Sequence, residues 1–149
     1  MKILLVDNTP LYRNILEQSL VDLRDFELSF AGSIAEAEAL CAKEHFYFFV
    51  IAWQLSDGEG IDLAHRLRDR GSLEPIVLLT ASPSAELAVR AANSGVTELF
   101  RKQDIDELVT FMRRFLVIFA PMHCRLLYVE DTRDQREMLT AQLQEWGMH

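Results

Sequence analysis

The stretch HFYFFVIA, residues 45–52, decides the fold, because it is a continuous apolar run of the length and composition of a strand buried on both faces. KILLVD (2–7) and PIVLLT (75–80) have the same character, and helix-like patterns lie between these runs. Strands that alternate with helices along a chain form a parallel sheet with helices on its faces. We therefore predict an α/β domain.

Two weaker strand patterns, at residues 27–31 and 97–101, bring the expected number of strand-helix units to five. Five such units joined by right-handed crossovers predict a flavodoxin-like (βα)5 fold, a doubly wound parallel sheet of strand order 2-1-3-4-5. Ligands and chemistry in such sheets lie at the carboxyl ends of the strands. The residues expected there are Asp7, Asn8, Ala52, Thr80 and Lys102.

Capping residues predict where the helices begin. The expected starts, in chain order, are Thr9 with Pro10, Ser33 with Glu36, Ser82 with Pro83, and Asp104 with Glu107. Gly95 is expected to end the fourth helix, and the fifth helix is expected to run to about Phe119.

Residues 1 to about 120, with the polar positions above, resemble the receiver domain of bacterial two-component response regulators (CheY-like domains). In that family an aspartate at the position of Ala52 takes a phosphoryl group, and two acids after the first strand help it to hold Mg²⁺. Here Asp7 matches the first acid, Asn8 replaces the second, and Ala52 removes the acceptor. The resemblance therefore implies a pseudo-receiver that is neither phosphorylated nor an enzyme, with no cofactor and with weak or absent Mg²⁺ binding.

Thr80 and Lys102 are retained, and in an active receiver both would contact the phosphoryl group. In this chain Lys102 can instead pair with Asp7, and Thr80 can satisfy a backbone group at its strand end. Leu99 stands where the family has a switch aromatic residue, which weakens the case for a conventional on/off switch.

Two alternatives stay open at the sequence level. A receiver of this type could accept phosphate at an atypical acid, Asp7 or Asp57, although Asp57 is more simply a turn residue beside Gly58. A relic of a haloacid-dehalogenase-like phosphatase is the second alternative, but its nucleophile would fall on Leu5.

An internal repeat accounts for the end of the chain. RLLYVEDTRDQREMLTAQL (125–143) aligns without gaps with KILLVDNTPLYRNILEQSL (2–20). We expect a receiver-like domain at 1–120, a linker at 121–124, and the first strand and helix of a second, truncated receiver at 125–149. Glu130 and Asp131 form an intact acidic pair there, which indicates that phosphorylation belongs to the second receiver of a tandem protein that also carries an output domain.

The fifth helix has more apolar residues than one buried stripe needs. The surplus suggests packing against a second receiver, against a second chain, or under the segment 122–149. In the family, dimers often form through the fourth helix, fifth strand and fifth helix. The candidate interface residues are Phe111, Met112, Phe115, Leu116 and Phe119.

Composition excludes two kinds of partner. The formal charge is −8, from 15 basic and 23 acidic residues, which argues against a nucleic-acid surface. No apolar run approaches the ~18–20 residues that a membrane-spanning helix needs. We therefore expect a cytoplasmic regulatory module that acts by protein–protein contact.

Overall fold

A computed structural model describes residues 1–22 and 26–119 of the chain. Its centre is a five-stranded parallel sheet of order β2-β1-β3-β6-β7, which confirms the predicted flavodoxin-like topology. The numbering differs from the predicted 2-1-3-4-5 only because a short hairpin adds two strands between β3 and β6. The strands of the sheet are β1 (Lys2–Val6), β2 (Glu27–Ala31), β3 (Phe48–Ala52), β6 (Ile76–Thr80) and β7 (Glu98–Arg101).

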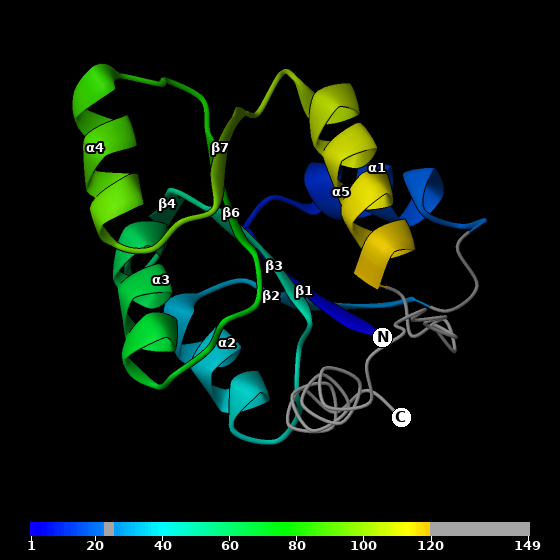
Figure 1. Cartoon of the computed structure of the whole chain (residues 1–149), viewed down its shortest axis with the longest axis horizontal. Helices are drawn as coiled ribbons and strands as arrows, with labels where there is room; N and C mark the ends of the chain where they lie inside the picture. The colour runs from blue at the N-terminus through cyan, green and yellow to red at the C-terminus, as the bar shows by residue number, and fades with distance from the viewer. Residues whose placement is uncertain (23–25, 120–149) are drawn as a thin grey trace, which may run out of the picture.

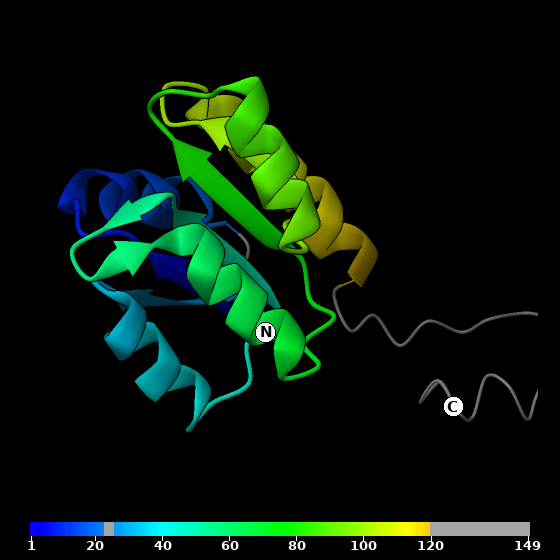
Figure 2. The same ribbon diagram turned by 90° about the vertical axis from the view of Figure 1, so that its left-hand side faces the viewer.

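Helices cover both faces of this sheet, as Figure 1 shows. They are α1 (Pro10–Ser19), α2 (Ile34–Cys41), α3 (Gly60–Asp69), α4 (Ala85–Asn93) and α5 (Ile105–Phe119). The view in Figure 2 shows α2, α3 and α4 lying side by side across one face. The opposite face is covered by α1 and α5, so the domain has three layers.

The three central strands β1, β3 and β6 form the core because their side chains are buried on both faces. Alternate residues feed two apolar clusters: Leu4 and Ile51 contribute to the cluster under α2, α3 and α4, whereas Leu5 and Val50 contribute to the cluster under α1 and α5. This is why these strands read as uninterrupted apolar runs in the sequence.

The capping predictions for α1 and α2 place both helix starts correctly. Pro10 is the first residue of α1, and Ser33 accepts a hydrogen bond from the Glu36 backbone N–H at 3.1 Å. Thr9 takes the cap position of α1, but its side chain makes no capping hydrogen bond. The Thr9 hydroxyl instead donates to Asn8 Oδ1 at 3.3 Å.

The predicted start of α4 at Ser82 and Pro83 is wrong by two residues. Ser84 is the cap, because its hydroxyl accepts from the Leu87 backbone N–H at 3.1 Å, and the helix begins at Ala85. Ser82 belongs to the preceding turn, where its backbone N–H donates to the Thr80 side chain. Serines on both sides of Pro83 made the two starts equally acceptable to a local capping rule.

The core stripe of α5 consists of Leu108, Met112 and Leu116, all with no exposed surface. Met112 and Leu116 are therefore core residues, and the prediction that they belong to an interface is wrong. Spacings of four residues place the three side chains on the single helix face that meets the sheet. Phe111 and Phe115 flank this stripe and contact the Phe48 ring edge-on, with centroid distances of 6.3 and 5.3 Å.

Several predictions fall on residues outside the described part of the chain. These are the linker 121–124, the second unit 125–149 with Glu130 and Asp131, and the side chain of Phe119. Within residues 1–22 and 26–119, no helix combines the length and apolar character required to cross a bilayer.

Candidate functional site

The carboxyl ends of β1, β3, β6 and β7 meet at one edge of the sheet, as predicted. A pocket of about 220 Å³ lies there, and its lining includes Asn8, Trp53, Thr80 and Lys102. Asp7 joins the same cluster through Lys102, and Ala52 ends the strand that leads into Trp53. The five positions singled out in the sequence are therefore brought to one place.

Both carboxylate oxygens of Asp7 are bonded to other groups of the protein. Its side chain has no exposed surface; Oδ2 accepts from Lys102 Nζ at 2.7 Å, and Oδ1 accepts from the Thr9 backbone N–H at 2.7 Å. The Lys102 ammonium also lies 4.6 Å from the centroid of the Tyr12 ring, a cation–π distance. Each Asp7 oxygen thus has a partner in the protein, as a buried carboxylate requires.

Thr80 serves the backbone of its own strand end. It is buried, its hydroxyl accepts from the Ser82 backbone N–H at 3.1 Å, and its carbonyl accepts from the Lys102 backbone N–H at 2.8 Å. These bonds join the turn after β6 to the residue after β7. Thr80 and Lys102 therefore have structural roles that need no phosphoryl group.

Ala52 is fully buried where β3 ends, and the chain closes tightly over it. The Gly60 backbone N–H donates to the Trp53 carbonyl at 2.6 Å. A Cβ added to Gly60 would lie 2.1 Å from the Ala52 carbonyl oxygen and 2.7 Å from Ile51 Cγ2, so only glycine fits. The Trp53 indole is partly buried beside this turn, and its buried Nε1 has no hydrogen-bond partner among the described residues.

The turn between β3 and α3 contains a hairpin that the sequence did not predict. Its strands are β4 (Gln54–Leu55) and β5 (Gly58–Glu59), paired antiparallel. Two-residue strands carry no periodic pattern, and the only local signal was the glycine at Gly58, whose φ is +156°.

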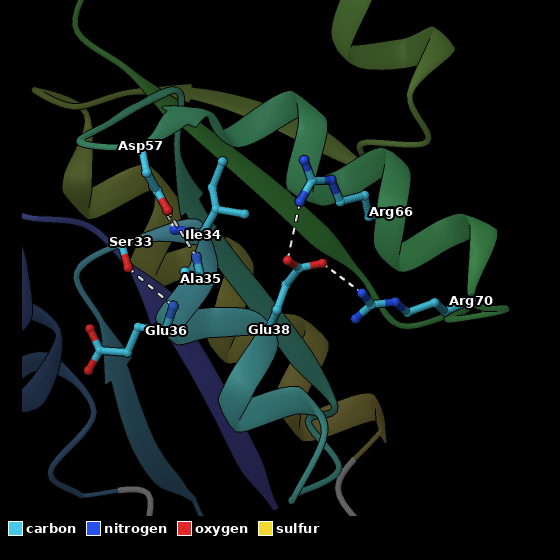
Figure 3. A network of polar contacts seen from close by, with 8 residues as sticks. All are labelled: Ser33, Ile34, Ala35, Glu36, Glu38, Asp57, Arg66 and Arg70. Carbon is cyan, nitrogen blue, oxygen red and sulfur yellow. Dashed lines mark hydrogen bonds and ion pairs between the residues drawn. The ribbon is translucent and has the colours of Figure 1, made fainter.

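Asp57, at the tip of this hairpin, caps a helix that lies 22 residues earlier in the chain. Figure 3 shows its carboxylate facing the start of α2, where Oδ1 accepts from the Ile34 N–H at 2.8 Å and Oδ2 from the Ala35 N–H at 3.0 Å. The Ala35 and Ile34 amides lower the pKa of Asp57 below its ordinary value of 3.8. Asp57 is therefore more than the turn residue that the sequence indicated.

Ion pairs add to the connection between α2 and α3. Glu38 accepts from Arg66 at 3.2 Å and from Arg70 at 2.7 Å (Figure 3). Both arginines are more than half exposed, and exposed pairs contribute only ~0–1 kcal/mol. The Asp57 cap, which satisfies two helix N–H groups that α2 cannot satisfy itself, is the more specific connection.

The acidic donors that the site offers to a cation are few. Among the described residues, no group of three His, Cys, Asp or Glu side chains lies close enough together to hold a metal ion. At the carboxyl edge the charge-bearing oxygens are those of Asp7, both already bonded, with the neutral amide of Asn8 beside them. Leu99 lies partly buried against the cluster under α3 and α4.

Comparison with known proteins agrees with this geometry. Residues 3–113 match the family described as Response regulator receiver domain. The chain is 31% identical to Response regulator protein PilR of Pseudomonas aeruginosa over 101 residues. This aligned region is 68% of the chain and 22% of PilR. It is 33% identical over 98 residues to Chemotaxis protein CheY-3 of Vibrio cholerae, which covers 64% of the chain and 75% of CheY-3.

A solved structure gives the same result. The signal receiver domain of an HD domain-containing protein from Pseudomonas fluorescens Pf-5 superposes with a TM-score of 0.71 at 28% identity, covering 84% of this chain and 93% of that one. A haloacid-dehalogenase-like phosphatase would need its nucleophile at Leu5. Leu5 is an apolar residue buried inside β1, so the site does not support that alternative. The chain belongs to the response regulator receiver domain family.

Proposed function

We propose that this receiver domain does not accept a phosphoryl group and works as a regulatory module through protein–protein contact. The observation that carries the proposal is Ala52, a buried methyl group at the end of β3 where receivers have their acceptor carboxylate. A methyl group has no lone pair with which to attack phosphorus, so covalent catalysis at this position is excluded by its chemistry.

The residues that would bind Mg²⁺ in a receiver are also incomplete in this chain. Mg²⁺ prefers octahedral oxygen ligands and gives up water reluctantly, so its protein sites supply carboxylate charge. The pocket at this edge has no Asp or Glu among the described residues of its lining, and the carboxylate beside it is Asp7. Binding a metal to Asp7 would displace Lys102 Nζ from Oδ2 or the Thr9 N–H from Oδ1. The residues present do not fit a Mg²⁺ site.

Neither atypical acid is a good substitute acceptor. Asp7 has no exposed side-chain surface, and its attack on a donor would break the Lys102 pair. Asp57 is accessible, but both of its oxygens accept hydrogen bonds from α2, and an acyl phosphate there would remove the cap. Structural use of both carboxylates therefore favours the non-phosphorylated form over a receiver with an unusual site.

The mode of action follows from the arrangement proposed for the whole chain. Residues 125–149 repeat the pattern of residues 2–20 and restore the acidic pair as Glu130 and Asp131, so phosphorylation is assigned to a second receiver after the linker 121–124. The first domain then regulates that receiver or an output domain by contact in the cytoplasm. The face formed by α4, β7 and α5 is the proposed contact surface, including contact with a second copy.

Calorimetric titration with Mg²⁺ tests the proposal, because a receiver must bind the metal before it takes phosphate. We expect no binding heat for the native chain and saturable binding for an Asn8→Asp, Ala52→Asp variant, which restores three neighbouring carboxylates. Saturable binding by the native chain with an affinity close to that of the variant contradicts the proposal. Thermal unfolding of both chains checks that the added charges leave the fold intact.

A further inference from the structure

An apolar groove lies at the amino ends of the strands, on the edge of the sheet opposite the site. Met1, Tyr47, Pro75 and Thr97 each immediately precede a strand, β1, β3, β6 and β7 respectively, and all four line the groove. Phe115 of α5, Leu73 and Glu74 complete this basal groove, whose volume is about 610 Å³.

The basal groove exposes apolar surface that the fold does not use. Leu73 is 92% exposed and Tyr47 is 44% exposed. The loop that presents Leu73 is held firmly: Arg68 Nη1 donates to the carbonyls of Ser72 and Glu74 at 2.9 and 2.7 Å. A large apolar side chain displayed on a fixed loop beside a groove is typical of a contact surface.

The helix α5 ends beside this groove. Phe115 lines the groove and lies one helical turn before Phe119, where α5 ends, and Figure 1 shows the N-terminus and the end of α5 at the same end of the domain. Residues 120–124 are Ala-Pro-Met-His-Cys, without an Asp, Glu, Lys or Arg, in a chain that is 26% charged. Met122 is three residues from the helix end, a reach of ~10 Å for an extended chain.

We propose that the linker 121–124, together with Ala120 before it, docks in the basal groove, with Met122 seated against Leu73 and Tyr47. The unbranched thioether of methionine adapts well to an irregular apolar groove. The rim also suits the residue after the linker: Glu74, paired with His45 at 3.2 Å, puts a carboxylate beside the groove, and Arg125 is the first charged residue beyond residue 124.

Docking of the linker fixes the direction in which the chain leaves the domain. The second unit would then be held at a set orientation to the first, instead of on a free tether. The inference goes beyond the proposed function and does not rest on the missing acceptor, because the groove and the site occupy opposite edges of the sheet.

Paramagnetic relaxation in the full chain tests the proposal. A nitroxide is attached to the native Cys124 after Cys41→Ser removes the other cysteine of the chain, and backbone amide signals are observed in isotope-labelled protein. We expect strong broadening at Tyr47, Leu73 and Thr97, and none at the opposite edge, at Asn8 or Lys102. Tethering alone also brings the label near the base of the domain, so variants decide the result.

Leu73→Asp and Met122→Asp should each reduce the broadening at Tyr47 and Thr97. Leu11→Asp is the matched control, because Leu11 is 57% exposed on α1, away from the groove, and it should change nothing. Broadening that survives Leu73→Asp shows a simple tether and overturns the proposal, as does an equal loss in the Leu11→Asp control. Broadening of labelled protein by a spin-labelled second copy shows that another chain fills the groove, and also overturns it.

Discussion

At the scale of single residues, the substitution at Ala52 changes what its neighbours do. In a receiver with an acceptor carboxylate, the lysine after β7 serves the phosphoryl group. Here the Lys102 ammonium is occupied by Asp7 at 2.7 Å and by the Tyr12 ring. A buried carboxylate without a cation would be costly, so the pair with Asp7 gives Lys102 a role in stability that requires no phosphoryl group.

This explanation predicts the effect of removing the lysine. Lys102→Met leaves the Asp7 carboxylate buried without a charge partner and should lower the free energy of unfolding by about 3 kcal/mol. Adding Asp7→Asn removes the unpaired buried charge and should recover part of the lost stability. A double-mutant cycle in urea denaturation measures this coupling. Additive losses would show that the two side chains do not depend on each other.

At the scale of elements, the hairpin and α2 behave as one unit through Asp57. The β4-β5 hairpin follows the acceptor position directly, and its tip satisfies two N–H groups at the start of α2. The turn that follows Ala52 is therefore anchored to a helix on the sheet face. This anchoring gives the turn a structural reason to keep its shape, whether or not the domain takes a phosphoryl group.

The Asp57 cap makes a prediction about pH. Because hydrogen bonds from α2 hold the folded-state pKa below 3.8, the carboxylate stabilises the fold above that pH, and the contribution is lost as pH falls through the lower folded value. Asp57→Asn should lower the melting temperature at neutral pH, and the difference from the native chain should shrink in acid. Asp69→Asn, whose carboxylate reaches only the exposed His65, should show no comparable loss at either pH.

The elements that the sequence predicted are those whose signal is local. Runs such as FFVIA show a doubly buried strand by composition, and Ser33 with Glu36 shows a helix start by spacing. The Asp57 cap was missed because its partners lie more than 20 residues away, and no spacing rule encodes such a contact. The assignment of Met112 to a contact surface failed because α5 has more apolar residues than one stripe needs, and only packing decides which of them meet the sheet.

At the scale of the whole molecule, the domain has one edge closed by Asp7 and Lys102, a basal groove at the other, and a side formed by α4, β7 and α5. Val89, on the helix α4 that contributes to this side, is 61% exposed. The proposed function by protein–protein contact would use such a surface, because a partner that binds one conformation of the domain more tightly shifts its population.

If the α4-β7-α5 face joins two copies, Val89→Glu should weaken their association without changing thermal stability, since the side chain lies outside the core. Sedimentation over a range of concentrations measures the effect, and Leu11→Glu is the control, because Leu11 is similarly exposed but belongs to α1, which is not one of the elements of this face. Equal behaviour of the two variants would remove this face as the site of self-association.

The absence of phosphoryl chemistry is tested most directly by intact-mass spectrometry after incubation with Mg²⁺ and a small-molecule phosphodonor. The native chain and the Asn8→Asp, Ala52→Asp variant are treated side by side, with peptide mapping to locate any added group. We predict an unmodified native chain and a variant that gains one phosphoryl group at residue 52. A phosphoryl group on the native chain within residues 1–119 would contradict the proposal, and the mapped residue would identify the acceptor.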